Sequence, residues 1–176
     1  MTTFRAVIIC LSLVFILSGC RWFSKAPVQQ YAGEHGWDPT VACEYMSDKM
    51  TPGQYKNEGG NVYGCVSEEK SLGAGSPSNT ITYFARGDAE RGREVGLRLK
   101  VNDPEKASDA LQTLLEYSQQ LSERSIGIPL SPSAGRGILS GNGGRGKVGT
   151  TKVEILRQNF PDGKGYELSY VITPQL

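Results

Sequence analysis

Hydrophobic residues recur at two different spacings along this chain, and the spacing changes from segment to segment. The clearest alternation lies in residues 95–101, where valine or leucine at every second position is separated by glycine, arginine or lysine. Such a segment has one apolar and one polar face, which is typical of a half-buried strand. The same criterion predicts strands over 62–67, 80–86, 153–156 and 166–173.

A long helix is expected after Asn102-Asp103-Pro104, because a capping residue followed by proline is a common helix start. An apolar stripe with three-to-four spacing follows, formed by Ala107, Ala110, Leu111, Leu114, Leu115, Ser118 and Leu121. Gly127 is the expected cap beyond its end, and Pro129 forbids continuation.

Two shorter helices and a loop complete the expected elements. Asp38-Pro39 predicts a first helix from Pro39 to about Lys49, and residues 132–140 suggest a short third helix. Residues 127–149 contain eight glycines and two prolines, so most of this region is expected to be an exposed loop.

The expected order is therefore a helix, three strands, the long helix and two strands. Strands joined by hairpins are antiparallel. We predict an α+β fold in which an antiparallel sheet of four to five strands packs against the long helix.

The amino-terminal segment has the three parts of a secretory signal peptide. Residues 6–17 form an almost unbroken apolar run, Arg5 precedes it, and the small residues Ser18 and Gly19 follow it. A membrane-spanning helix needs about 20 apolar residues, so this run is too short to be one.

The end of this leader, Leu17-Ser18-Gly19-Cys20, resembles the lipobox of bacterial lipoproteins. The resemblance implies cleavage before Cys20, a diacylglyceryl thioether on its sulfur, and acylation of the new amino group by a fatty acid such as palmitate. Two or three acyl chains give durable anchoring where one does not. In the enterobacterial lipoproteins that the leader resembles, aspartate at the next position favours inner-membrane retention. Arg21 therefore implies the outer membrane, with the protein facing the periplasm.

The chain is accordingly divided into a leader (1–19), a lipidated tether (20–36) and a single α+β domain (37–176). Glycine is abundant, at 22 of 176 residues, which favours turns and short strands over a helical bundle. Without the leader, the chain has 18 basic and 18 acidic side chains. This balance argues against a nucleic-acid-binding protein, which usually carries a basic excess.

Four cysteines are present, and two remain after cleavage and lipidation. Cys43 and Cys65 would form a disulfide in an oxidising compartment, joining the first helix to the first strand. The alternative is a redox or metal pair. The chain has no Cys-x-x-Cys spacing and its single histidine is His35, so the disulfide is the better interpretation.

No catalytic residue, metal ligand or cofactor is predicted. His35 lies in the tether, and the adjacent Glu68 and Glu69 would point to opposite faces of a strand. Residues 141–147 resemble the phosphate-binding pattern GxxxxGK, but Val148 replaces the required serine or threonine and a strand follows. Residues 141–147 are therefore interpreted as a flexible glycine loop within the glycine-rich region 135–149.

One charged hairpin is a candidate interface. Arg86, Arg91, Arg93 and Arg98 are interspersed there with three acidic residues, and arginine is favoured where proteins meet. The alternative is a hairpin whose mixed charges simply face solvent and prevent edge pairing.

These observations favour a non-enzymatic envelope lipoprotein that binds another protein. A periplasmic immunity protein against a delivered toxin is one form, and a component of secretion or envelope assembly is another. The alternatives are a cell-envelope hydrolase that uses carboxylates and a carrier of small ligands. A partner-binding function predicts that changing Arg91 and Arg93 weakens binding if the hairpin is the interface.

Overall fold

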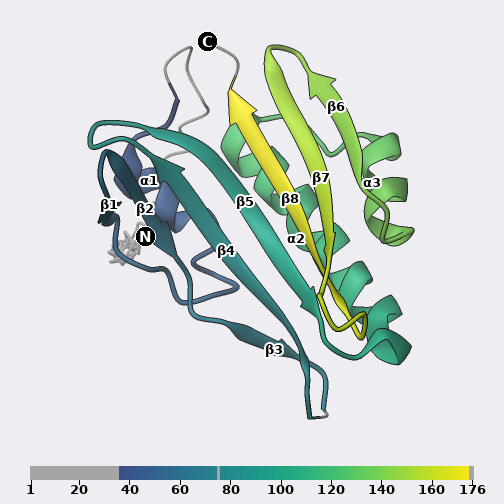
Figure 1. Cartoon of the computed structure of the whole chain (residues 1–176). Helices are drawn as coiled ribbons and strands as arrows, with labels where there is room; N and C mark the ends of the chain where they lie inside the picture. The colour runs from purple at the N-terminus through teal and green to yellow at the C-terminus, as the bar shows by residue number, and fades with distance from the viewer. Residues whose placement is uncertain (1–35, 75, 175–176) are drawn as a thin grey trace, which may run out of the picture.

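The computed structural model describes residues 36–74 and 76–174, in which helices cover one face of an antiparallel sheet (Figure 1). The strands are β1 (Lys56–Gly59), β2 (Val62–Val66), β3 (Lys70–Leu72), β4 (Asn79–Gly87), β5 (Gly92–Val101), β6 (Gly144–Val148), β7 (Thr151–Asn159) and β8 (Tyr166–Pro174). The helices are α1 (Pro39–Glu44), the 3-10 turn η1 (Pro104–Lys106), α2 (Ala107–Ile126) and α3 (Pro132–Leu139).

The strands lie in the order β1-β2-β4-β5-β8-β7-β6, and β3 pairs with β4 beside β2. Each of these pairs is antiparallel. The chain leaves the sheet after β5, forms α2 and α3, and builds the β6–β7 hairpin before β8 returns beside β5. The α+β class with an antiparallel sheet on a long helix is confirmed.

The core lies between the sheet and α2. On β5, Val95, Leu97, Leu99 and Val101 are fully buried, as their alternation predicted. On β8 the same face carries four buried residues: Tyr166, Leu168, Tyr170 and Ile172. The facing stripe of α2 includes five buried apolar residues: Ala110, Leu111, Leu114, Tyr117 and Leu121. Each of these larger side chains stabilises the fold by about 1.5–3 kcal/mol when fully removed from water.

The ends of the long helix are placed by the residues that the sequence indicated. The Asp103 carboxylate accepts a hydrogen bond from the Glu105 backbone N–H at the start of η1. Gly127 has φ of 70°, and its N–H donates to the Glu123 carbonyl, which closes the last turn. The left-handed backbone at this position favours glycine.

The first helix begins as predicted but ends earlier. Asp38 accepts hydrogen bonds from the backbone of Thr40 and Val41, which caps α1. The helix stops at Glu44, and residues 45–49 form turns instead of continuing it. In a longer helix, the Tyr45 carbonyl would accept a hydrogen bond from the backbone N–H four residues later. Here it accepts a hydrogen bond from the Arg124 guanidinium instead, at 2.6 Å.

The sheet has eight strands rather than the expected four to five. The extra strands are β1, β3 and β6, and all three are short and largely exposed. β6 also corrects the interpretation of 127–149 as mostly loop, although the expected helix near 132–140 is present as α3. Strands exposed on both faces have no alternation of apolar and polar residues, so the pattern could not reveal them.

The disulfide between Cys43 and Cys65 is present and joins α1 to β2. Both residues are buried, and their Cα atoms lie 6.1 Å apart. The predicted connection between the first helix and the first predicted strand is confirmed.

Candidate functional site

The four arginines of the predicted interface lie at two places on the β4–β5 hairpin. Arg86 and Arg98 belong to the strands and project from the sheet face opposite α2, because their neighbours Ala85, Leu97 and Leu99 face the core. Arg91 lies in the turn between the strands, and Arg93 is the second residue of β5, next to that turn. The structure therefore does not gather all four into one patch.

Three of these arginines form ion pairs within the chain. Arg86 Nε lies 3.5 Å from Glu58, Arg93 Nη2 lies 3.0 Å from Asp88, and Arg98 Nε lies 3.1 Å from Glu167. The side chains are about 30–40% exposed. Ion pairs at such exposure contribute little to stability, but they hold the guanidinium groups in place.

Phe84 connects Arg86 and Arg98 and was not anticipated from the sequence. Both guanidinium carbons lie 5.4 Å from the centre of the Phe84 ring, within the range of cation–π attraction. The ring covers Gly96, its direct partner across the β4–β5 pair, and is only 3% exposed. A glycine within the strongest predicted strand is the sequence signal that a ring packs against the backbone there.

The turn of the hairpin is held by Asp88 and Tyr55. The Asp88 carboxylate accepts from the N–H groups of Glu90 and Arg91 and from Arg93 Nε, and these bonds lower its pKa. The Tyr55 hydroxyl donates to the Asp88 and Arg91 carbonyls, and burial raises its pKa. These contacts fix the conformation of the turn.

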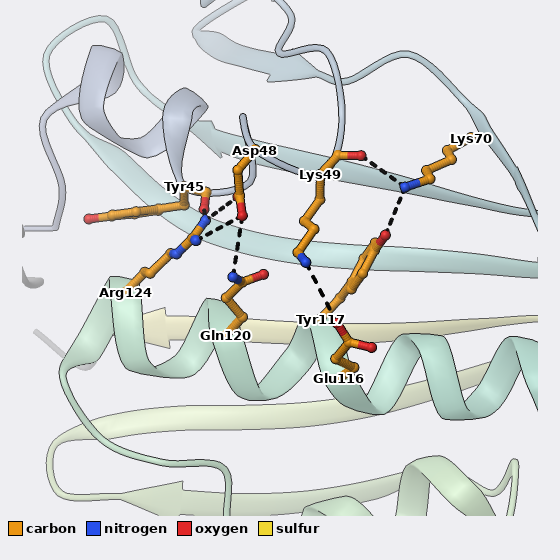
Figure 2. Close-up of polar contacts among 8 residues, drawn as sticks. All are labelled: Tyr45, Asp48, Lys49, Lys70, Glu116, Tyr117, Gln120 and Arg124. Carbon is orange, nitrogen blue, oxygen red and sulfur yellow. Dashed lines mark hydrogen bonds and ion pairs between the residues drawn. The ribbon is translucent and has the colours of Figure 1, made fainter. Parts of the chain in front are cut away.

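A polar cluster lies between residues 45–49 and α2, on the face of the sheet that α2 covers (Figure 2). Arg124 Nη2 lies 3.1 Å from Asp48 Oδ2, and Gln120 Nε2 donates to the same oxygen at 3.4 Å. The hydrogen bond from Arg124 is the main reason that the pKa of Asp48 is lowered. The cluster fastens the turn after α1 to the last two turns of α2.

Tyr117 lies between two lysines at the same interface (Figure 2). Lys70 Nζ donates to the Tyr117 hydroxyl at 2.8 Å and to the Lys49 carbonyl at 3.1 Å. Lys49 Nζ is 5.8 Å from the ring centre and 3.6 Å from Glu116. The Tyr117 ring is only 6% exposed, so this group connects β3 and α2 rather than presenting a reactive side chain.

The third place of interest is the edge of the sheet formed by β6, next to α3 (Figure 1). Within the described part of the chain, β6 pairs with β7 on one side and with no strand on the other. A hollow of about 220 Å³ lies between β6 and α3. Glycines and apolar residues make up most of its lining: Ala134, Gly137, Gly143, Gly144, Gly146, Val148, Val153 and Ile155. Ser131, Ser133 and Arg145 complete it.

Two glycines of β6 leave this hollow open. Gly144 and Gly146 pair with the buried Ile155 and Val153, so their missing side chains would point to the helix side of the sheet. A Cβ atom added to Gly146 would have no neighbour within 4 Å. The hydroxyl groups of Ser131 and Ser133 lie at the α3 end of the hollow.

The opposite face of β6 is basic. Arg145 and Lys147 alternate with the glycines, and Lys147 lies opposite Lys152 of β7. Glu154 is 3.2 Å from Arg145 Nε and 2.7 Å from Lys152 Nζ, so this one carboxylate contacts two cations of the β6–β7 pair. Arg145 and Lys147 were expected in a loop, so the sequence did not indicate this edge.

No protein-family model, curated protein or solved structure matches this chain. Within the described residues, histidine, cysteine and acidic side chains form no group of three that could hold a metal ion. No described helix is both long and apolar enough to cross a membrane. The predicted leader, the predicted lipidation site at Cys20, Arg21 and His35 lie outside the described residues.

Proposed function

We propose that this chain is a lipid-anchored protein of the bacterial envelope that binds another protein at the β6 edge of its sheet. The leader with its Leu17–Cys20 motif supports cleavage before Cys20 and attachment to a membrane, and Arg21 supports the outer membrane. The β6 edge, with its neighbouring hollow, supports the binding function. Exposed strand edges pair with extended segments of other proteins.

Two biological roles fit this proposal. One is a periplasmic immunity protein that binds and blocks a toxin, and the other is a component of secretion or envelope assembly. A hydrolase acting through carboxylates and a carrier of small ligands are the competing functions. The described carboxylates Asp48, Glu69 and Glu154 each contact a cation within the chain, and the β6 hollow is lined by no carboxylate. These contacts favour the binding function.

Lipid attachment is tested by expressing the full chain with its leader in a bacterium and fractionating the envelope. We expect the protein in the outer-membrane fraction, with an acylated amino-terminal cysteine in the mass spectrum. Cys20→Ser should abolish the acyl mass and release the protein from the membrane, whereas Cys10→Ser should change neither. An intact leader on the mature protein, or an unmodified Cys20 thiol, contradicts the proposal.

The binding surface is tested by placing a photo-crosslinking residue at Lys147 and, in a separate variant, at Arg91. The β6 proposal predicts that one partner is captured from position 147 and that Gly146→Pro in the same variant abolishes the capture. Capture from position 91 alone would instead favour the arginine hairpin. If neither position yields a crosslinked partner, the proposed binding function is wrong.

A further inference from the structure

The β6 edge has two properties that together constrain what can bind there. One face of the strand is basic, at Arg145 and Lys147, and the other opens into the hollow beside α3. In an antiparallel pair, every other residue of an edge strand turns its N–H and C=O groups away from its partner. An extended peptide could therefore continue the sheet beyond β6 through backbone hydrogen bonds.

We propose that the partner segment is an extended peptide in which acidic and apolar residues alternate, and this rests on the function proposed above. Side chains of an added strand alternate between the two faces of the sheet. On one face they would meet Arg145 and Lys147, where acidic side chains are favoured. On the other face they would enter the hollow, where apolar side chains are favoured.

The charges on the basic face support an acidic residue there. Arg145 is the most exposed cation of the ion pairs in the described chain, with 79% of its side chain accessible. It shares Glu154 with Lys152, so the carboxylate is divided between two cations. Opposite charges placed directly across a strand pair attract, and like charges repel. An acidic side chain on an added strand would balance the excess positive charge along β6 and β7.

The hollow supports an apolar residue at the alternate position. Its volume of about 220 Å³ is sufficient for one large side chain. Its apolar wall is formed by Ala134, Val148, Val153 and Ile155, and Ser131, Ser133 and Arg145 also line it. Gly146 and Gly144 contribute no side chain to fill it. The hollow therefore has the size and chemistry of a pocket for a leucine or a similar residue.

Pairing between two copies of this chain is disfavoured by the same charges. Antiparallel pairing of β6 with a second β6 would bring Arg145 and Lys147 close to the same residues of the other copy. This repulsion is a recognised protection of edge strands against self-association. An acidic partner avoids the repulsion, whereas a second copy does not.

The experiment measures binding of synthetic peptides to the full mature protein in detergent. A fluorescent peptide alternating glutamate and leucine should bind, and a peptide alternating lysine and leucine should bind roughly tenfold more weakly or not at all. A block peptide of the same composition, with all glutamates before all leucines, tests the alternation. A peptide with methylated backbone amides tests whether binding needs backbone hydrogen bonds. In NMR spectra of the protein, the amide signals of β6 should change most on binding.

Variants test the two faces of β6 separately. Gly146→Val should fill the hollow without a steric clash and weaken binding by roughly tenfold. The double change Arg145→Glu with Lys147→Glu should reverse the preference, so that the lysine peptide binds better than the glutamate peptide. Lys56→Glu on β1, at the opposite edge, is the matched charge control and should leave binding unchanged. Thermal unfolding verifies that each variant is folded.

The outcomes separate this inference from the proposed function. Equal binding of all extended peptides, still sensitive to amide methylation and Gly146→Val, would overturn the acidic pattern but leave binding at the edge. Peptide binding that changes with neither amide methylation nor Gly146→Val would also overturn the β6 edge as the binding site. Dimerisation in sedimentation that Gly146→Val abolishes would show a second copy as the occupant. Binding to anionic vesicles that needs Arg145 and Lys147 but not Gly146 would show a membrane surface instead.

Discussion

Phe84 is an apolar side chain on a sheet face that no described helix covers, yet it is almost completely buried. Its ring rests on Gly96 and is flanked by the guanidinium groups of Arg86 and Arg98. Contacts of this kind contribute about 0.5–1 kcal/mol each at exposed sites. The arginines, which the sequence suggested as an interface, therefore also shield an aromatic residue from water.

Gly96→Ala is expected to destabilise the fold by about 1–3 kcal/mol, the usual range for overpacking. The added Cβ would lie 2.5 Å from Phe84 Cζ and 2.6 Å from the Tyr170 carbonyl oxygen, and the backbone oxygen cannot move aside. Gly146→Ala is the matched control, because a Cβ there meets nothing within 4 Å. Urea unfolding measures both variants, and equal stabilities would show that Gly96 is not tightly packed.

Acidification is expected to lower stability through three carboxylates. Hydrogen bonds from Arg124 to Asp48, from Thr80 and Lys100 to Glu69, and from the Glu90 and Arg91 backbone to Asp88 lower their pKa values from the ordinary 3.8 or 4.5. The unfolded chain therefore binds protons more readily than the folded chain. This stabilisation is complete above the ordinary pKa values and is lost as the pH falls through the lower, folded ones.

The measurement is the urea midpoint at neutral pH and at successively lower pH down to about 3. Asp48→Asn should lower stability at neutral pH and reduce the decline on acidification, because one of the three carboxylates is gone. A midpoint that stays constant, or rises, below pH 4 would contradict this assignment of the stabilising charges.

At the level of single elements, the sequence predicted those with a buried face and missed those without one. The alternation in β5 and β8 and the stripe along α2 record burial directly, so these elements were placed correctly. β6 reads Gly-Arg-Gly-Lys-Val and lies at an edge, where its side chains meet solvent or the hollow beside α3. Local composition therefore indicated a loop, and only the pairing with β7 makes it a strand.

The early end of α1 has a similar cause. Tyr45, Met46 and Met50 are buried, so their spacing continues the apolar pattern of a helix beyond Glu44. The contact that ends the helix, from Arg124 to the Tyr45 carbonyl, spans 79 positions of the chain. No local pattern can indicate an interaction between residues so far apart.

Removal of the disulfide is expected to lower the free energy of unfolding by roughly 3 kcal/mol, the loop-entropy value for residues separated by 22 positions. The test compares Cys43→Ala with Cys65→Ala in one chain against the parent by urea unfolding. Parent protein treated with a reductant is the control and should lose a similar amount. A loss below about 1 kcal/mol would show that α1 is held to β2 mainly by other contacts.

At the scale of the whole molecule, the fold class could be predicted from the sequence, but the strands at the two edges of the sheet could not. Connections between neighbouring strands were read correctly where a hairpin is short, as between β4 and β5. The position of β8 between β5 and β7 depends on contacts between distant segments. The candidate site at β6 was missed because it depends on that arrangement and on α3 lying beside it.

The central strands are expected to exchange their amide hydrogens most slowly. β5 pairs with β4 over residues 92–100 and with β8 over residues 95–101, and its valines and leucines are completely buried. β6 pairs with one strand and is exposed over most of its length. Amides of β5 should exchange only through global unfolding, and those of β6 by local opening. Hydrogen-exchange mass spectrometry or NMR measures both, and equal protection of β6 would show that something covers this edge.

The two ends of the described chain meet, because Gly36 and Pro174 line the same hollow beside Arg93. Neighbouring ends are what circular permutation needs. A short linker could join 174 to 36, and new termini could open in the exposed turn at 161–164. Such a rearranged polypeptide would keep every strand beside its present neighbours, so the order of synthesis is separable from the architecture it produces.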